Sequence, residues 1–249
     1  MSATDALGVV DSGDRRLPQI ADAEPVLLAW NDVALAGYAW WASAPAPTFL
    51  LLHGWGEDAS TLAPVARQVK QRDWHAISMS LRGWRGSIGV DDYGLSAARD
   101  IGRVLDWIRK QPKAESVVLL GFSMGGLMAA LAAAEQVNLA GVILVSSPSD
   151  LRTFYRDTAY GGVRRYFDQV LQPQQWRGSS PLTHAGEISH PTLVVTGLRD
   201  TMTPADQGTR MAAALPHAEL LELPDMGHHP SAKEWEFILD QAARMFRLA

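Results

Sequence analysis

The amino-acid sequence predicts an α/β protein built on a mainly parallel sheet with helices on both faces. Short apolar runs that suit buried strands alternate along the chain with stretches whose apolar residues recur every three or four positions, as on one face of a helix. The chain has 249 residues, of which 47% are hydrophobic and 20% charged. This length and composition suit a globular protein that buries a large core.

The elements follow one another in order. Two apolar runs around the Asn31-Asp32 turn predict an antiparallel hairpin at the start of the sheet. The runs that predict strands are VLLAWND, VALAGYAWW, TFLLLHGW, HAISMSL, VVLL, LAGVILVSSP, PTLVVTG and AELLELP. The stretches with helical spacing cover 62–69, 95–108, 127–134, 205–215 and 235–246.

Two segments depart from this alternation. Residues 1–24 are polar and without periodicity, so we expect a loose N-terminal arm ahead of a domain over residues 25–249. Residues 150–188 follow the sixth strand and are rich in aromatic residues without a clean strand. Ligands bind near the carboxyl ends of the strands in such sheets, so we expect this insertion to form a short helical lid. The alternative is a helical pair that only packs against the sheet.

Composition excludes several functions. The net charge is −5, which argues against nucleic acid or an anionic membrane surface as a partner. There is no cysteine, which rules out disulfides, thiolate metal sites and a cysteine nucleophile. We expect no signal peptide and no membrane-spanning segment, and therefore a cytoplasmic location.

A serine lies where a predicted strand gives way to a predicted helix. Ser123 occupies the centre of Gly121-Phe122-Ser123-Met124-Gly125, a G-x-S-x-G match. Such a serine sits on a sharp turn between strand and helix, where glycines leave room for the neighbouring backbone. The pattern alone is weak, but its strand-then-helix context predicts that Ser123 is a nucleophile rather than an ordinary turn residue.

A serine nucleophile needs backbone donors at the point where oxyanion charge develops. The third strand ends in His53-Gly54-Trp55-Gly56, an H-G-x-G match. We expect the backbone N–H of Trp55 to supply one donor and that of Met124 the other. The alternative for this stretch is a tight turn that simply needs glycine.

An acid and a base follow in the second half of the chain. Asp200 comes just after a buried strand, where a carboxylate can orient an imidazole. Asp150, after the sixth strand, is the rival position, and either aspartate could instead cap a helix or a turn. His228 in the loop after the last strand is the predicted base. Its neighbour His229 is expected to pack or form hydrogen bonds behind the site.

The order Ser123, Asp200, His228 resembles that of the α/β-hydrolase superfamily. The stretches HGWGED, RGWRGS, GFSMGG, GLRDTMTP and GHHP all fall in the order of that family, from about Val26 to the C-terminus. The resemblance implies eight strands, a catalytic triad and an oxyanion hole, with neither cofactor nor metal. One departure is Ser80 in SLRGWRGS, where many relatives carry Asp.

The resemblance implies a serine hydrolase that works through an acyl-enzyme. Phe122, Tyr155 and Tyr160 are expected to make the substrate pocket apolar, which suits a carboxylic ester of small to medium acyl or aryl type. Thioesterase, lactonase, carbon–carbon bond hydrolase and perhydrolase activities and acyl transfer to an alcohol use the same residues, as does a small-molecule receptor on this fold. The sequence predicts a small-molecule substrate and leaves the oligomeric state open.

Overall fold

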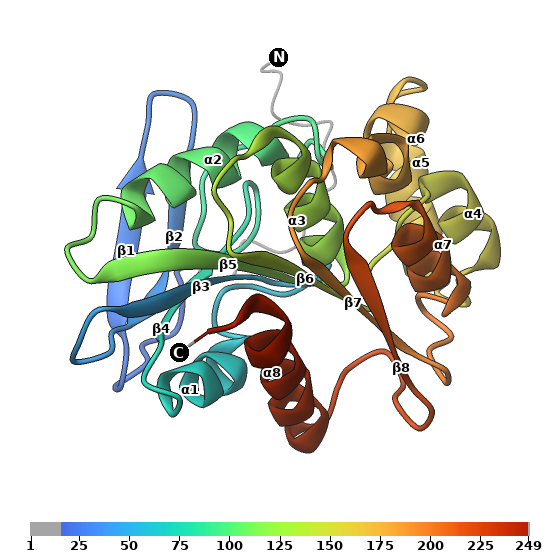
Figure 1. Cartoon of the computed structure of the whole chain (residues 1–249). Helices are drawn as coiled ribbons and strands as arrows, with labels where there is room; N and C mark the ends of the chain where they lie inside the picture. The colour runs from blue at the N-terminus through green and yellow to red at the C-terminus, as the bar shows by residue number, and fades with distance from the viewer. Residues whose placement is uncertain (1–15, 249) are drawn as a thin grey trace, which may run out of the picture.

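The computed structural model describes residues 16–248. The strands in this part of the chain are β1 (Glu24–Ala29), β2 (Ala34–Trp40), β3 (Ala46–Leu52), β4 (His75–Met79), β5 (Ala114–Phe122), β6 (Gly141–Val145), β7 (Thr192–Gly197) and β8 (Ala218–Leu223). They form one eight-stranded sheet in the order β1-β2-β4-β3-β5-β6-β7-β8 (Figure 1).

The direction of the strands matches the predicted fold class. β1 and β2 form the expected antiparallel hairpin around the Asn31-Asp32 turn, and β2 is also antiparallel to β4. All the remaining pairs, from β4 across to β8, are parallel. In a parallel sheet the loops after the strands gather at one edge, so the segments that follow β3, β5, β7 and β8 meet there.

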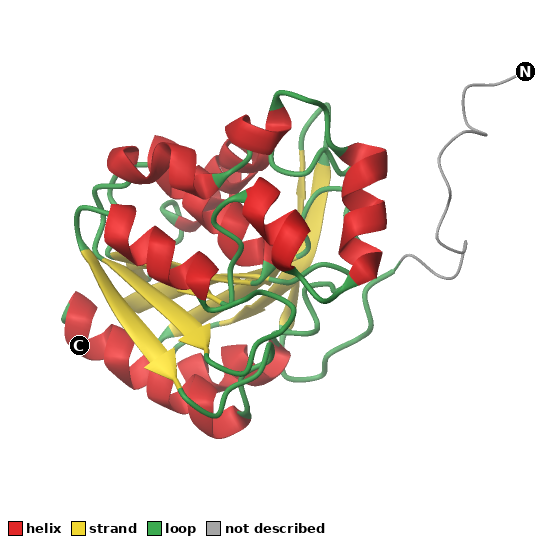
Figure 2. Cartoon of the chain, turned by 90° about the vertical axis from the view of Figure 1, so that its right-hand side faces the viewer, coloured by secondary structure: helices red, strands yellow, loops and turns green. Residues whose placement is uncertain are grey.

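Helices cover both faces of the sheet (Figure 2). They are α1 (Ala63–Lys70), α2 (Ala97–Ile108), α3 (Met124–Glu135), α7 (Asp206–Ala214) and α8 (Ala232–Phe246). α1 and α8 lie on one face, while α2 and α3 lie on the other (Figure 1). The face of α8 predicted to be apolar is the buried one, from Trp235 to Phe246. The α/β-hydrolase fold expected from the resemblance is therefore confirmed.

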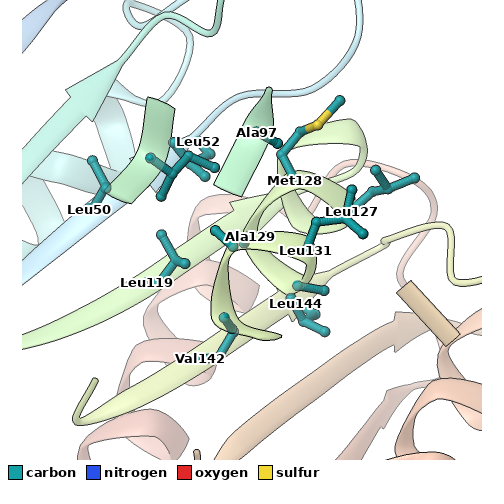
Figure 3. Close-up of a cluster of buried hydrophobic side chains, with 14 of the residues drawn as sticks. Leu50, Leu52, Ala97, Leu119, Leu127, Met128, Ala129, Leu131, Val142 and Leu144 are labelled. Atoms are coloured by element: carbon teal, nitrogen blue, oxygen red, sulfur yellow. The ribbon is translucent and has the colours of Figure 1, made fainter. Parts of the chain in front are cut away.

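The core is divided by the sheet into two layers. Along β3, Leu50 and Leu52 belong to the layer under α2 and α3, whereas Phe49 and Leu51 belong to the layer under α1 and α8. This alternation follows from the pleat, because successive side chains of a strand point to opposite faces. Figure 3 shows part of the first layer, in which Leu50, Leu52, Leu119, Val142 and Leu144 of the sheet lie beside Leu127 and Leu131 of α3.

The aromatic segment after the sixth strand is a helical insertion, as expected. It comprises α4 (Leu151–Asp157), α5 (Gly161–Val170), α6 (Gln175–Gly178) and the 3-10 helix η1 (Pro181–Glu187), and it lies between β6 and β7. Phe154 of α4 and Phe167 of α5 are buried and join the layer under α2 and α3. The insertion therefore shares a core with the sheet domain.

Residues 1–15, most of the expected loose arm, lie outside the described residues. The described part, residues 16–23, runs beside β2 and α1. The Tyr38 hydroxyl donates a hydrogen bond to the Pro18 carbonyl, and Arg67 donates to the Asp22 carboxylate at 2.7 Å. The Arg67 guanidinium lowers the pKa of Asp22 to about 2. Among residues 16–248 no helix combines the length and the apolar character needed to cross a membrane.

Candidate active site

Ser123 occupies the turn between β5 and α3, at the carboxyl edge of the sheet. Its φ of 51° and ψ of −119° place it in a backbone region that residues other than glycine rarely adopt. Backbone hydrogen bonds hold this turn: the Ser123 N–H donates to the Val145 carbonyl at 2.8 Å, and the Ser123 carbonyl accepts from the N–H groups of Gly126 at 2.9 Å and Leu127 at 3.2 Å. The strained turn predicted for a nucleophilic serine is thus present.

The glycines around Ser123 are required by the approach of other backbone segments. A Cβ added to Gly121 would lie 2.2 Å from the carbonyl oxygen of Gly125, and one added to Gly125 would lie 2.1 Å from that of Leu52. Leu52 is the last residue of β3 and pairs with Gly121 in the sheet. The glycines therefore let α3 begin directly against β3 and β5, which brings the loop after β3 next to Ser123.

Three side chains that the sequence predicts to act together are within hydrogen-bond distance. His228 Nε2 lies 3.0 Å from Ser123 Oγ, and His228 Nδ1 lies 2.8 Å from Asp200 Oδ2. The Asp200 side chain is 0% exposed and that of His228 10% exposed. A carboxylate can only accept, so Nδ1 carries the proton and Nε2 accepts from the Ser123 hydroxyl. This is the arrangement in which an imidazole takes up a serine proton.

Backbone N–H groups also hold Asp200, whereas Asp150, the other candidate acid, has a structural role. Asp200 Oδ1 accepts hydrogen bonds at 2.8 Å from the N–H groups of Met202 and Thr203. Asp150 begins α4, where its side chain accepts a hydrogen bond from the Thr153 N–H at 2.7 Å. Asp200 is therefore the aspartate that contacts His228, and Asp150 is a helix N-cap.

The loop after β3 presents backbone donors near Ser123. Within residues 16–248 the N–H groups of Trp55 and Met124 donate to no protein acceptor, and both residues line the same cavity as Ser123. Met124 is the first residue of α3, so its N–H is one of the unpaired donors at a helix N-terminus. The two amides expected to receive an oxyanion are thus available at the site.

The buried side chain of His53 fixes the position of the loop after β3. Burial lowers the pKa of His53 to about 4, so its ring is neutral at pH 7. Its Nε2 accepts a hydrogen bond from the Leu81 N–H at 3.0 Å, so Nδ1 carries the proton and donates to the Gly54 carbonyl at 2.8 Å. His53 therefore ties the loop that follows β3 to the loop that follows β4.

A cavity of about 290 Å³ opens beside Ser123. Its size is near the lower end of about 300–1,000 Å³ that is usual for small-molecule sites. Aromatic rings form much of the wall, and His228 and Met124 lie among them. The lining residues are Gly54, Trp55, Gly56, Glu57, Tyr93, Phe122, Ser123, Met124, Pro148, Phe154, Tyr160, Val163, Met202, His228 and His229.

Two of the three predicted pocket residues line this cavity, and one does not. Phe122 lies against the His228 ring, with 5.2 Å between ring centroids, and Tyr160 lies 6.0 Å from Trp55. Tyr155 is placed elsewhere: its ring contacts Trp176, and its hydroxyl donates to Asp168 at 2.9 Å. The prediction for Tyr155 is wrong because the preceding residue of α4, buried Phe154, is the one turned to the cavity.

Sequence reasoning missed other residues of the wall. Tyr93 and Val163 reach the cavity from the loop before α2 and from α5, and no local pattern marks them. Glu57 lies in HGWGED, one of the stretches that carry the family resemblance, but the pattern assigns it no role. His229 was expected behind the site, yet its side chain is 63% exposed and lies 3.3 Å from Glu57 at the cavity. In the described part of the chain, no three acidic or histidine side chains converge as a metal site.

The fold and this geometry define the class of protein: it is a serine hydrolase of the α/β-hydrolase superfamily. Residues 82–246 match the prolyl oligopeptidase family, and the chain belongs to that family. The match spans the segment from the loop after β4 to the end of α8, and it includes Ser123, Asp200 and His228.

Curated relatives agree with this class. The chain is 26% identical over 246 residues to a 2-hydroxy-6-oxononadienedioate/2-hydroxy-6-oxononatrienedioate hydrolase of Cupriavidus pinatubonensis, across 78% of this chain and 83% of that one. It is 23% identical to acylamino-acid-releasing enzyme 1 of Oryza sativa subsp. japonica, across 77% of this chain and 27% of the rice protein.

Solved structures share the fold. An esterase of Pyrococcus furiosus superposes with a TM-score of 0.72 at 19% identity, covering 90% of this chain and 91% of its own. Est1E of Butyrivibrio proteoclasticus, solved with ferulic acid bound, superposes with a TM-score of 0.75 at 15% identity, covering 89% and 99%.

Proposed function

We propose that the protein hydrolyses carboxylic esters with a small to medium acyl or aryl group through an acyl-enzyme on Ser123. The observation that carries the proposal is the chain of hydrogen bonds from Ser123 through His228 to Asp200, at 3.0 and 2.8 Å, opening onto a cavity with aromatic walls. A serine hydroxyl is a weak nucleophile at neutral pH, and this contact supplies the base that it needs.

The steps follow from the positions of the groups. His228 Nε2 takes the Ser123 proton as Oγ attacks the ester carbonyl carbon, and Asp200 stabilises the imidazolium that forms. The N–H groups of Trp55 and Met124 bind the oxyanion, where one such donor contributes about 3 kcal/mol to the transition state. The proton then passes from His228 to the departing alcohol, and water attacks the acyl-enzyme in a second round.

The cavity supports the substrate class. With about 290 Å³ it suits an acyl group of modest size, and the rings of Tyr93, Phe122 and Phe154 offer apolar contact. Est1E, which shares the fold, was solved with ferulic acid bound, and this acid carries an aryl group. Tyr160 of the insertion lines the cavity too, so we assign the insertion a role in shaping the acyl site.

The name of the relative from rice describes release of acylamino acids, so amide hydrolysis is the second candidate. The two are separated by p-nitrophenyl butyrate and butyryl p-nitroanilide, which share one acyl group. We expect the wild type to turn over the ester many times per site and to cleave the anilide far more slowly. Ser123→Ala should remove turnover of both. Equal or faster anilide cleavage would make the protein an amidase, and a single labelling event without turnover would fit a receptor.

A further inference from the structure

Glu57 places a carboxylate in the wall of the cavity. It follows the loop that carries Trp55, and its side chain is only 16% exposed. Glu57 Oε2 accepts a hydrogen bond from the Gly54 N–H at 2.8 Å, and Oε1 lies 3.3 Å from His229 Nε2. The carboxylate is therefore held at the N–H of Gly54, the residue directly before Trp55, whose own N–H is expected to bind the oxyanion.

The residues that line the cavity include no lysine or arginine that could neutralise the Glu57 carboxylate. Of the lining residues, all of which belong to the described part of the chain, Glu57 is the only acidic one, and the bases are His228 and His229. His228 is engaged with Ser123 and Asp200, and His229 is largely exposed at the rim. An anionic acyl group would therefore face the Glu57 carboxylate, and the cavity wall offers that group no lysine or arginine as a partner.

The rest of the wall favours the opposite charge. Five of the lining side chains are aromatic, namely Trp55, Tyr93, Phe122, Phe154 and Tyr160. Aromatic faces attract ammonium groups through the ring quadrupole, and a nearby carboxylate adds direct attraction.

The position of Glu57 also affects the reaction itself. Negative charge develops on the substrate oxygen as Ser123 attacks, and the Glu57 carboxylate repels it. A positive charge on the substrate offsets that repulsion, and it does so most in the transition state. Such a charge should therefore raise kcat as well as lower KM.

We propose that Glu57 makes this site selective for esters that carry a positive charge close to the reacting carbonyl, as a quaternary or protonated amine. The proposal rests on the ester hydrolysis proposed above and names its substrate class. It also separates this protein from its relative in Cupriavidus pinatubonensis, whose named substrates are dioates and thus carry two carboxylates.

Three p-nitrophenyl esters of similar size test the proposal. They are the 4-(trimethylammonio)butanoate, its neutral isostere the 5,5-dimethylhexanoate, and the anionic glutarate monoester. We expect kcat/KM to be at least about tenfold higher for the cation than for the neutral isostere, and lowest for the anion. Each ratio is divided by the same ratio for hydroxide-catalysed hydrolysis, which removes differences in intrinsic reactivity.

Glu57→Gln assigns the effect to one charge. The amide oxygen of glutamine can still accept from the Gly54 N–H, so the variant removes the charge and keeps the acceptor. The readout is the cation-to-neutral ratio, which should fall severalfold, to the preference that the aromatic rings alone confer, whatever happens to the absolute rate. Glu115→Gln, an exposed acid at the start of β5, removes the same net charge elsewhere and should leave the ratio unchanged.

The outcomes separate this proposal from the one on which it rests. A ratio that is the same in the wild type and in Glu57→Gln, or a preference for the anion, would overturn the selectivity while leaving ester hydrolysis in place. Turnover of none of the three esters, or full turnover by Ser123→Ala, would instead overturn the proposed function.

Discussion

The Tyr166 hydroxyl, on α5, donates a hydrogen bond to the Asp91 carboxylate, in the loop between β4 and α2. The other oxygen of Asp91 accepts from the Tyr93 N–H at 2.9 Å, and Tyr93 packs edge-on against Phe167 with 4.7 Å between ring centroids. The helical insertion is thus fastened to the sheet domain at a largely buried carboxyl group, next to the wall of the cavity. Burial raises the pKa of Asp91 and that of Tyr166.

This raised pKa predicts a pH-dependent stability. Folded Asp91 binds its proton more tightly than the unfolded chain, whose reference pKa is 3.8. The free energy of unfolding therefore falls as pH rises from about 3.8 through the raised value, by about 1.4 kcal/mol for each pH unit that separates the two pKa values. Asp91→Asn lacks this loss.

Urea denaturation of both proteins between pH 4 and pH 7 measures the effect. We expect the free energy of unfolding of Asp91→Asn to become larger relative to that of the wild type as pH increases, because every other titrating group is common to both. A difference that stays constant, or that changes in the opposite direction, would show that Asp91 ionises as freely in the folded protein as in the unfolded chain.

The two aspartates considered for the acid should behave differently. Asp200→Asn leaves the His228 tautomer wrongly fixed, so we expect kcat on p-nitrophenyl butyrate to fall by about 10⁴-fold with the fold intact. Asp150→Asn keeps a good N-cap and should change the activity less than about twofold. Steady-state kinetics with circular dichroism on both variants checks this. A larger loss of activity in Asp150→Asn than in Asp200→Asn would instead identify Asp150, which follows β6, as the acid.

The positive φ of Ser123 predicts an unusual order of stability. Both Ser123→Ala and Ser123→Gly should abolish turnover, but only glycine is unstrained at a φ of 51°. Replacing alanine by glycine usually costs roughly 0.5–1 kcal/mol, whereas the strain stored at such a residue is about 1–3 kcal/mol. We expect the melting temperature of the glycine variant to equal or exceed that of the alanine variant. A clearly lower value would mean that the turn is not strained.

Two tyrosines of the insertion give a matched pair for substrate preference. Tyr160 lines the cavity, whereas Tyr155 faces Trp176 and Asp168. Tyr160→Ala should enlarge the site and move the optimum along a series of p-nitrophenyl esters from acetate to decanoate towards longer chains. Tyr155→Ala should leave the optimum in place. If both profiles match that of the wild type, the insertion does not shape the acyl site.

The fold could be predicted because the sequence patterns that determine it are local, each lying within one strand, one helix or one turn. The apolar runs predicted all eight strands, and G-x-S-x-G between a strand and a helix predicted the turn at Ser123, because its glycines answer a local need for close backbone approach. The contacts of Asp200 and His228 with each other were predictable only because parallel strands deliver their loops to one edge.

The cavity wall was less accessible to the same reasoning. Tyr155 and Phe154 are adjacent aromatic residues, and which of them faces the cavity depends on how α4 is rotated against the sheet. That rotation is set by packing with α5 and α6, which leaves no local mark. Glu57 was overlooked for a similar reason, since its contact with His229 joins two loops that are far apart in the sequence.

Ser123 is the nucleophile of the proposed mechanism, and covalent labelling tests this role directly. Diethyl p-nitrophenyl phosphate reacts with serine nucleophiles and leaves a stable diethylphosphoryl group, which peptide mass spectrometry can locate. We predict one such group per chain on the peptide that contains Ser123, formed in step with the loss of ester turnover, and none on Ser123→Ala. A label on another residue, or complete labelling of Ser123 with turnover retained, would contradict the mechanism.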